Sequence, residues 1–423
     1  MIKPLLRTLL RTRPGRFLFS RMQAACAVDN PAPVDASVID VAADPGRALF
    51  DMVYQADLAD RERHDFNDLR RAERLARDKS RPLTINWFVP EPTGGGSGGH
   101  MNIFQLARHL ENAGHHNRLY AIPNCFLPND GAMRDLIARH YCDPGTVETI
   151  TDSRVLQDSD ICVATGWDTA YRLYLMDNTR FKVYLVQDFE PAFYGIGSHY
   201  LFAENTYRMN FFGIFGSPWL ATLMGDRYEF RGIPFRYGYD PVRYRRLPGV
   251  EREQDLVAAY IRPRTARRGL ELMLGALAVL KGRRPQTRII LFGAAEKLRN
   301  LSFDCEQAGI MDEEGLCRLY NRAAVVLLTS LTNYSIIPVE AMACGALVVD
   351  VRMPSIQSVF TDGEHLALAN ADPLAMARTA ARMLDATAER DRITSQAEVF
   401  IRDMRWEIVR NKIVEQLLAA YWG

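Results

Sequence analysis

The feature that most constrains this chain is a repeated alternation of short, largely apolar runs with longer segments of helical periodicity. Runs such as 84–89, 182–186 and 324–329 show little alternation of polar and apolar residues, which predicts strands covered on both faces of a sheet. Strands that alternate with helices form βαβ units with parallel pairing. The chain therefore predicts an α/β fold built on doubly wound parallel sheets.

Two such sets follow one another along the chain. The predicted strands lie at 84–89, 117–122, 161–165, 182–186, 211–215, 256–261, 287–292, 324–329 and 346–350. The predicted helices lie at 101–113, 269–281, 313–323, 336–344 and 374–384. Two Rossmann-like domains of this kind would face each other across a cleft at the carboxyl ends of their strands, where ligands of such sheets bind.

We expect five segments along the chain. They are a basic arm, linker and helical extension at 1–80, a Rossmann-like domain at 81–225, a linker at 226–253, a second Rossmann-like domain at 254–400, and a C-terminal crossover helix at 401–423. A length of 423 residues suits two or three domains.

Charge and cysteine usage exclude several classes of protein. The formal net charge of +1 gives no overall field to attract nucleic acid, so we expect no such partner. Seven scattered cysteines form no C-x-x-C pair, which favours packed, reduced thiols in a cytoplasmic protein. No run reaches the ~18 apolar residues that span a bilayer.

The first 22 residues carry six basic side chains and no acid, interleaved with leucine and phenylalanine. One interpretation is peripheral contact with anionic lipid at the inner face of the plasma membrane. The other is a poorly ordered basic terminus, because Pro14-Gly15 would break any long amphipathic helix.

A glycine-rich loop, 91–100, follows the first predicted strand and opens a helix. Backbone amides of Gly98 and Gly99 at such a helix start attract a phosphate or another anion. His100 is a candidate general base or hydroxyl-orienting group, with an ordinary capping residue as the alternative. The spacing is not that of a nicotinamide-binding loop.

Two acidic motifs differ in their place relative to a strand. Asp188 and Glu190 follow the strand 182–186, where a carboxylate can recognise a hydroxyl or abstract a proton, and Asp188 is the stronger candidate. A helix-start acid before Pro191 is the alternative. Asp158 and Asp160 form a D-x-D before their strand, at the wrong end of the sheet for a metal site, so we expect a solvated turn.

Cations follow two strands of the second set. Arg262, Arg264, Arg267 and Arg268 come after 256–261, and guanidinium groups can fork onto phosphate oxygens. We expect Arg262 and one of the pair Arg267 and Arg268 to bind a diphosphate without a metal, and Arg264 to lie on the surface. Lys297, after the strand 287–292, could reach the same phosphates.

The segment 329–349 contains a strand end, a polar turn and a short helix. Ser335 is predicted to cap that helix, whose free amides would point at a phosphate in the cleft. Tyr334, Ser335 and Ile336 are therefore candidate ligand-binding residues. Glu340 could accept two hydroxyl protons, as from a ribose, with a structural salt bridge as the alternative. Gly345 would end the helix.

These residues resemble the retaining-type glycosyltransferases of paired Rossmann-like architecture (GT-B), group four. The run from Pro338 to Val349 is similar to the second half of that family's pattern, E-x7-E followed by A-x-A-x-G-x-P-V-V. The run 258–269 resembles its phosphate-binding strand, and Trp406 resembles its late tryptophan. Thr332 stands where the first glutamate belongs, which suggests a deoxysugar or a contact shifted to Tyr334 or Asn333.

The glycine loop and the run 186–191 are similar to bacterial rhamnosyltransferases that build rhamnan or surface glycans from dTDP-L-rhamnose. This resemblance implies transfer of a hexosyl group, with L-rhamnosyl favoured, from a nucleotide-diphosphate sugar to a growing surface polysaccharide or O-antigen-like glycan, free or lipid-linked. It implies catalytic roles for Asp188, His100 and Glu340, and no metal or other cofactor. The alternatives are a nucleotide-sugar epimerase of the same fold and a noncatalytic sugar- or nucleotide-binding subunit.

Overall fold

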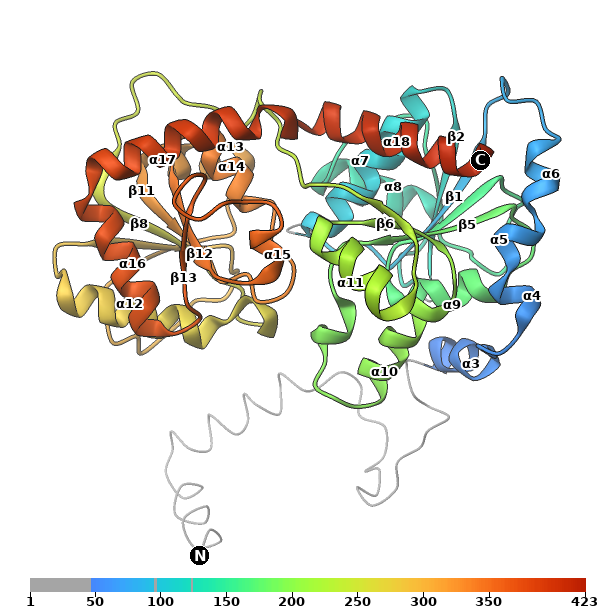
Figure 1. Cartoon of the computed structure of the whole chain (residues 1–423), viewed down its shortest axis with the longest axis horizontal. Helices are drawn as coiled ribbons and strands as arrows, with labels where there is room; N and C mark the ends of the chain where they lie inside the picture. Colours follow the sequence, from blue (N-terminus) through green and yellow to red (C-terminus); the bar gives the residue numbers. More distant parts are fainter. Residues whose placement is uncertain (1–46, 95–96, 123–124) are drawn as a thin grey trace, which may run out of the picture. The chain divides into compact units, whose positions relative to one another are not determined.

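The computed structural model describes residues 47–94, 97–122 and 125–423, and these contain two separate parallel sheets (Figure 1). The basic arm, with its expected lipid contact, lies outside the described residues. The predicted fold class, two doubly wound Rossmann-like α/β domains, is confirmed. Within the described residues, the structure contains no helix that combines the length and apolarity needed to cross a membrane.

The first sheet has seven parallel strands in the order β3-β2-β1-β4-β5-β6-β7. Its strands are β1 Thr84–Val89, β2 His116–Ala121, β3 Glu148–Ile150, β4 Ile161–Ala164, β5 Phe181–Val186, β6 Phe212–Phe215 and β7 Gly232–Pro234. Its helices are α7 Gly98–Asn112, α8 Asp130–His140, α9 Trp167–Leu175, α10 Ser198–Asn205 and α11 Pro218–Tyr228. Every residue of β4 and β5 is buried, as expected of strands covered on both faces.

The second sheet has six parallel strands in the order β10-β9-β8-β11-β12-β13. Its strands are β8 Glu253–Tyr260, β9 Arg288–Phe292, β10 Glu306–Gly309, β11 Ala323–Leu327, β12 Leu347–Val351 and β13 Ala367–Ala369. Its helices are α12 Leu270–Arg283, α13 Glu313–Arg322, α14 Ile337–Ala343, α15 Pro354–Gln357, α16 Pro373–Asp385 and α17 Thr387–Phe400. The order reverses between β8 and β11, which is where ligands of such sheets bind.

The predicted linker 226–253 is partly wrong, because its start belongs to the first sheet. There β7 pairs with β6, and Gly232 lies opposite Gly213. A Cβ on Gly232 would stand 2.0 Å from the carbonyl oxygen of Gly213, so only glycine allows this approach. The chain then crosses to the second sheet after Phe235.

A second crossing returns the chain to the first domain. The last helix, α18 Trp406–Trp422, packs against α7 of the first domain. At its start the two crossings are hydrogen-bonded to each other: the amide of Tyr239 donates to the carbonyl of Met404, and the amide of Trp406 donates to the carbonyl of Tyr239, each at 3.0 Å. The predicted crossover helix is thereby found within 401–423.

The predicted helical extension is attached to the first domain by a buried arginine. It forms α3 Arg47–Gln55, α4 Arg61–His64, α5 Phe66–Leu69 and α6 Arg71–Leu75. Arg74 is buried, and its guanidinium donates to the carbonyls of Tyr421 at 3.0 Å, Asn67 at 2.6 Å and Arg180 at 3.3 Å. The extension therefore joins the first sheet to the end of α18.

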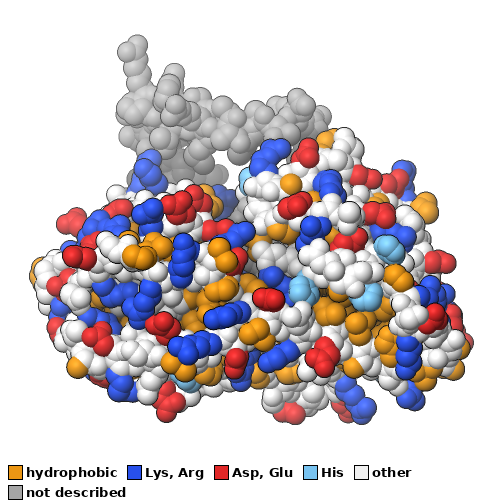
Figure 2. All heavy atoms as spheres, turned by 90° about the horizontal axis from the view of Figure 1, so that it is seen from above, with side chains coloured by type: hydrophobic (Ala, Val, Ile, Leu, Met, Phe, Trp, Pro, Cys, Tyr) orange, Lys and Arg blue, Asp and Glu red, His pale blue; other side chains and the backbone are white. Residues whose placement is uncertain are grey.

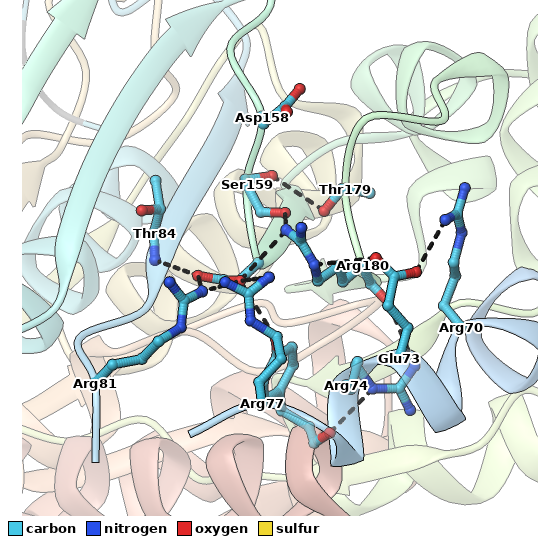
Figure 3. Close-up of polar contacts among 12 residues, drawn as sticks. Arg70, Glu73, Arg74, Arg77, Arg81, Thr84, Asp158, Ser159, Thr179 and Arg180 are labelled. Carbon is cyan, nitrogen blue, oxygen red and sulfur yellow. Dashed lines mark hydrogen bonds and ion pairs between the residues drawn. The ribbon is translucent and has the colours of Figure 1, made fainter. Parts of the chain in front are cut away.

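The expectation of a solvated D-x-D turn is wrong for Asp160, which is buried beside Arg77, Arg81 and Arg180; Figure 3 shows these three arginines. The Asp160 side chain is only 3% exposed and forms ion pairs with Arg77 at 3.2 Å, Arg81 at 2.7 Å and Arg180 at 3.5 Å. It also accepts the backbone amide of Thr84 at the start of β1. Asp158 is exposed and turned away from this cluster, so Asp160 is the structural residue of the motif and Asp158 lies on the surface.

Candidate functional site

A cleft of about 1470 Å³ runs along the carboxyl ends of the strands and is lined from both sheet domains. Candidates from the sequence that line it are Gly98, Gly99, His100, Asp188, Arg262, Arg268, Tyr334, Ser335, Ile336 and Glu340. Three others do not: Lys297 and Arg264 are exposed, and Thr332 is not among the lining residues. The outer surface carries charges of both signs intermingled, as in the face drawn in Figure 2, in keeping with the net charge of +1.

The glycine loop reaches the cleft at the start of α7. Ser97 caps this helix by accepting the amide of His100, and Gly98 and Gly99 form its first residues. The side chain of Gln187 donates to the carbonyl of Gly99 at 3.2 Å, and Asn102 donates to Gln187 at 3.0 Å. These bonds fix the loop against the end of β5, as an anion site at a helix N-terminus requires.

His100 is held at both ring nitrogens. Its Nε2 lies 3.1 Å from the carbonyl oxygen of Pro90, which can only accept, so Nε2 carries the proton and Nδ1 accepts from the hydroxyl of Ser97 at 3.0 Å. Burial lowers the pKa of His100, against the opposite effect of the Pro90 carbonyl. Because protein groups use both ring nitrogens, these contacts give His100 a positioning function in the glycine loop, and its predicted function as a base or hydroxyl-orienting group stays a prediction.

Asp188 connects the two domains across the cleft. Its Oδ1 accepts the backbone amides of Phe189 at 2.8 Å and of Asn333 at 2.9 Å, and its Oδ2 accepts from Nε of Arg267 at 3.0 Å. Both oxygens are thus used by protein donors. The arrangement gives Asp188 a positioning function, and its predicted catalytic function stays a prediction.

The four arginines after β8 differ in their contacts. Arg267 pairs with Asp188 and lies 4.1 Å from the ring centroid of Phe193. Arg262 donates from Nε to the hydroxyl of Tyr260 at 2.9 Å while lining the cleft. Arg268 lines the cleft, and its guanidinium has no hydrogen-bond or ion-pair partner among the described residues. Arg264 pairs with Glu296 on the surface, as expected.

The helix α14 carries Glu340 into the cleft as a buried carboxyl group. Burial raises the pKa of Glu340 to about 8, although the hydroxyl of Tyr244 donates to it. The structural salt bridge considered as the alternative for Glu340 is absent among the described residues. Burying an acid without a cation costs free energy, so a buried acid in a cleft is a candidate functional residue.

The predicted Ser335 cap is wrong. Ile336 occupies the cap position with helical dihedral angles, φ −68° and ψ −26°, and no side chain caps α14. A capping side chain needs an extended backbone at that residue, which this tight turn does not provide. Ser335 and Ile336 line the cleft instead. Tyr334 is buried, and its hydroxyl accepts the amide of Tyr237 at 2.7 Å, so it packs the two domains together.

Sequence reasoning missed a group on the first-domain wall. Trp167 and Asp168 begin α9 and line the cleft with Tyr194, whose hydroxyl accepts from the indole of Trp167 at 2.9 Å. Burial raises the pKa of Asp168 to about 6 and that of Glu190 to about 8. The only signal for Asp168 was an acid at a strand end, after 161–165.

Chemically, the cleft offers an anion site and a hydroxyl site on opposite walls. Arg262 and Arg268 can fork onto phosphate oxygens, and Glu340 lies on the same wall. Aromatic rings and carboxyl groups face them from the first domain. A ligand that joins a diphosphate to hydroxyl-bearing rings would use all of these groups.

Comparisons with known proteins give the same picture. Residues 256–386 match the family model "Glycosyl transferases group 1", and residues 146–214 match "WsaF, N-terminal domain". The O-antigen biosynthesis protein RfbC of Myxococcus xanthus is 30% identical over 362 residues, which are 81% of this chain and 27% of that protein. The chain thus spans about a quarter of this relative's length.

Solved structures share the fold. Anabaena Alr3699/HepE in complex with UDP and glucose aligns with a TM-score of 0.62 and 18% identity over 80% of this chain and 100% of that one. A point mutant of S. aureus TarM, in complex with fondaparinux, alpha-GlcNAc-glycerol and UDP, aligns with a TM-score of 0.65 and 8% identity over 81% of this chain and 100% of that one. These structures show that the chain has the GT-B fold, and residues 256–386 are similar to the group 1 glycosyltransferase model.

Proposed function

We propose that this chain, with its group 1 domain in a GT-B fold, transfers a hexosyl group from a nucleotide-diphosphate sugar to a bacterial surface glycan of the O-antigen kind. The observation that carries the proposal is that two arginines, Arg262 and Arg268, and the buried Glu340 line the same cleft. The printed name of the Myxococcus xanthus relative, an O-antigen biosynthesis protein, supports the acceptor class.

The favoured donor is dTDP-L-rhamnose. Support comes from the likeness of the glycine loop and the run 186–191 to rhamnosyltransferases. Rhamnose lacks one hydroxyl of an ordinary hexose, which agrees with Thr332 in place of an acid and with its position away from the cleft lining. The reaction would take place in the cytoplasm, at the inner face of the plasma membrane if the acceptor is lipid-linked.

Each residue takes a role that follows from its contacts. Arg262 and Arg268 neutralise the charge that develops on the departing diphosphate, with the amides of Gly98 and Gly99 facing the transferred group. Glu340 accepts hydrogen bonds from hydroxyl groups of the nucleotide sugar. His100 positions the glycine loop through Pro90 and Ser97, and Asp188 acts through Arg267 and the turn at Asn333.

The test is a donor panel read by thermal unfolding and by transfer. dTDP-, UDP- and GDP-sugars are added to the full chain, and the donor should raise the melting temperature by mass action. Arg268→Ala should weaken donor binding by at least about tenfold, the value of a charge-assisted hydrogen bond. Arg264→Ala is the matched control, because it removes a surface arginine, and it should leave donor binding and transfer unchanged.

Three results would contradict the proposal. If donor binding and transfer are unchanged in Arg268→Ala and Glu340→Ala, the assignment of the donor site to this cleft is wrong. Nucleotide release that needs no acceptor would indicate the epimerase. Tight donor binding without turnover on any surface-glycan acceptor would indicate a noncatalytic subunit.

Metal removal gives an independent check. Because the proposal assigns the leaving-group charge to Arg262 and Arg268, transfer should be unchanged after dialysis against a chelator, and added Mn²⁺ or Mg²⁺ should not raise the rate. A rate that falls on chelation and returns with one of these ions would give a metal the role assigned to the arginines.

A further inference from the structure

A second, smaller pocket of about 170 Å³ lies at the end of α14 that is remote from the cleft. It is lined by Arg246, Arg252, Gly345, Arg390, Asp391, Thr394 and Ser395, and we call it the arginine pocket. None of these residues lines the large cleft. Since liquid water occupies roughly 30 Å³ per molecule, the pocket has room for a small anion and its nearest waters.

Two of the three guanidinium groups are held in place by the protein. Arg252 donates to the carbonyls of Tyr320 at 3.1 Å and of Cys344 at 2.9 Å, where α13 and α14 end. Arg390 is 2% exposed and donates to the carbonyls of Met383 and Leu384. Its Nε is buried and has no partner among the described residues.

Arg246 completes the pocket from its rim. Its side chain is 51% exposed and pairs with Glu398 at 3.0 Å. Gly345, with φ at +73°, leaves space for it, because a Cβ there would stand 2.5 Å from the guanidinium carbon. Asp391 is the single carboxylate among the lining residues, so the lining carries more positive than negative charge.

Three cations at one pocket repel each other. Burial, together with the charges of Arg246 and Arg390, lowers the pKa of Arg252 to about 10. Such a cluster costs free energy in the empty protein and gains it when an anion enters. We propose that the arginine pocket binds a phosphoryl-type anion, held by the guanidinium groups of Arg246 and Arg390.

The presence of Asp391 predicts which anion is preferred. A carboxylate repels a fully ionised anion but accepts a hydrogen bond from one that still carries a hydroxyl group. Monohydrogen phosphate has such a hydroxyl at neutral pH and sulfate does not. The pocket should therefore bind phosphate more tightly than sulfate, and Asp391→Asn should narrow that difference.

The experiment titrates the full chain with inorganic phosphate at constant ionic strength, with thermal unfolding and calorimetry as readouts. Arg246→Ala should weaken phosphate binding by at least about tenfold, and because Arg246 is half exposed this variant should fold. Ser395→Asp should abolish binding. Arg245→Ala removes a neighbouring exposed arginine that does not line the pocket, and it should bind like the parent.

The large cleft also has arginines, so Arg268→Ala serves as a second control and should keep phosphate binding. Binding that survives in Arg246→Ala and is lost in Arg268→Ala would move the anion to the cleft and overturn the proposal. No saturable effect of phosphate on the parent chain would overturn it as well. Neither result depends on the glycosyl transfer proposed above.

The phosphoryl group could be free or part of a lipid. Sedimentation with phosphatidylglycerol vesicles in phosphate-free buffer separates the two sources, with phosphatidylcholine vesicles as the control. Pelleting that Arg246→Ala abolishes and free phosphate competes for would identify a lipid headgroup. A phosphate effect in calorimetry without pelleting would identify a soluble phosphoryl ligand.

Discussion

Glu340 is a buried acid whose pKa of about 8 has a direct consequence for donor binding. A carboxyl group that accepts sugar hydroxyls must be ionised, so the donor binds the deprotonated form and releases a proton at neutral pH. Donor affinity should rise by up to about tenfold per pH unit below pH 8 and level off above it.

Calorimetry in buffers of different ionisation enthalpy measures this released proton. Glu340→Gln keeps the shape of the side chain and should remove both the proton release and the pH dependence. If the parent protein binds its donor with the same affinity at pH 6 and pH 8.5, the proposed contact between Glu340 and a hydroxyl is wrong.

Glu190 makes a prediction about folding. Its carboxyl accepts the amide of Trp167 at 2.6 Å and the hydroxyl of Tyr184 at 3.0 Å, and burial raises its pKa from the usual 4.5 to about 8. Between these values the folded state holds a proton that the unfolded state has lost. Its contribution to stability is full below about pH 4.5 and falls as the pH rises toward 8, by up to about 1.4 kcal/mol per unit.

Glu190→Gln should flatten this part of the stability curve. The amide oxygen can accept the same two donors, and no charge needs to be buried. Urea unfolding at pH 5, 6.5 and 8 measures the effect, with the parent losing more free energy of unfolding than the variant. An equal loss in both proteins would show that Glu190 does not titrate in this range.

At the scale of single residues, the sequence predicted positions better than contacts. Asp188 was found because it ends an apolar strand, yet its three protein donors come from β5's own turn, from Asn333 and from Arg267, more than 75 positions away in the chain. Asp160 was misjudged for the same reason, since the arginines that bury it come from other segments. Long-range ion pairs leave no local pattern.

At the scale of elements, Asp160 holds the helical extension on the first sheet. Asp160→Ala would remove the carboxylate shared by Arg77, Arg81 and Arg180 and leave Arg180 with Glu73 alone. The change should cost about 3 kcal/mol of stability, the lower end for breaking a buried pair. Asp158→Ala removes an exposed carboxylate two positions away and should change stability by less than about 0.5 kcal/mol. Denaturant unfolding measures both.

Limited proteolysis adds a local readout to that comparison. Cleavage between α6 and β1 should appear in Asp160→Ala and not in Asp158→Ala, because the extension loses its attachment. If the two variants have the same stability and the same cleavage pattern, the ion pairs contribute nothing and the extension is held by Arg74 and apolar packing.

The pair Gly213 and Gly232 allows β6 and β7 to meet. Gly232→Ala should destabilise by about 1–3 kcal/mol, because the new methyl group would overlap the neighbouring strand. Gly225 lies in α11, and a Cβ at that position would have nothing within 4 Å, so Gly225→Ala should stabilise by roughly 0.4–1 kcal/mol. Melting temperatures that shift in opposite directions in the two variants would confirm the prediction, and shifts in the same direction would contradict it.

Strands with continuous apolar runs could be predicted, whereas very short strands and some helices, such as α8 and α17, could not. Strands β1, β5, β9 and β12 lie within one residue of the expected ranges at each end, because their apolar runs are continuous. The three-residue strands β3 and β7 were missed, since their pairing is decided by neighbours in space. The same holds for the extension, which gains its order from the sheet and from α18.

At the scale of the whole described chain, the contact between the two sheet domains rests on few polar groups. Asp188 binds Arg267 and the amide of Asn333, and Tyr334 accepts the amide of Tyr237. Asp188→Ala should weaken this contact by roughly 2 kcal/mol or more. In the absence of donor, small-angle X-ray scattering should then show a larger radius of gyration than in the parent.

A donor that binds both walls of the cleft should reverse the expansion. The matched control is Asp168→Ala, which removes a carboxyl group from the cleft wall without touching the second domain. An unchanged radius of gyration in Asp188→Ala would show that the domains are held together without Asp188, by the crossings, by Tyr334 and by the side chain of Asn333, which donates to the carbonyls of Gln187 and Gly216.

The two crossings also have a mechanical consequence. Tyr239 is bonded on both sides to the strand of chain around Met404 and Trp406, and Gly238 has no side chain to keep them apart. A single strand would act as a tether that swivels freely. Two crossing segments that are hydrogen-bonded to each other act as a hinge with one axis, which permits bending and resists twisting. Opening and closing should therefore follow one repeatable path, so that each donor meets the same opposing wall in the same register.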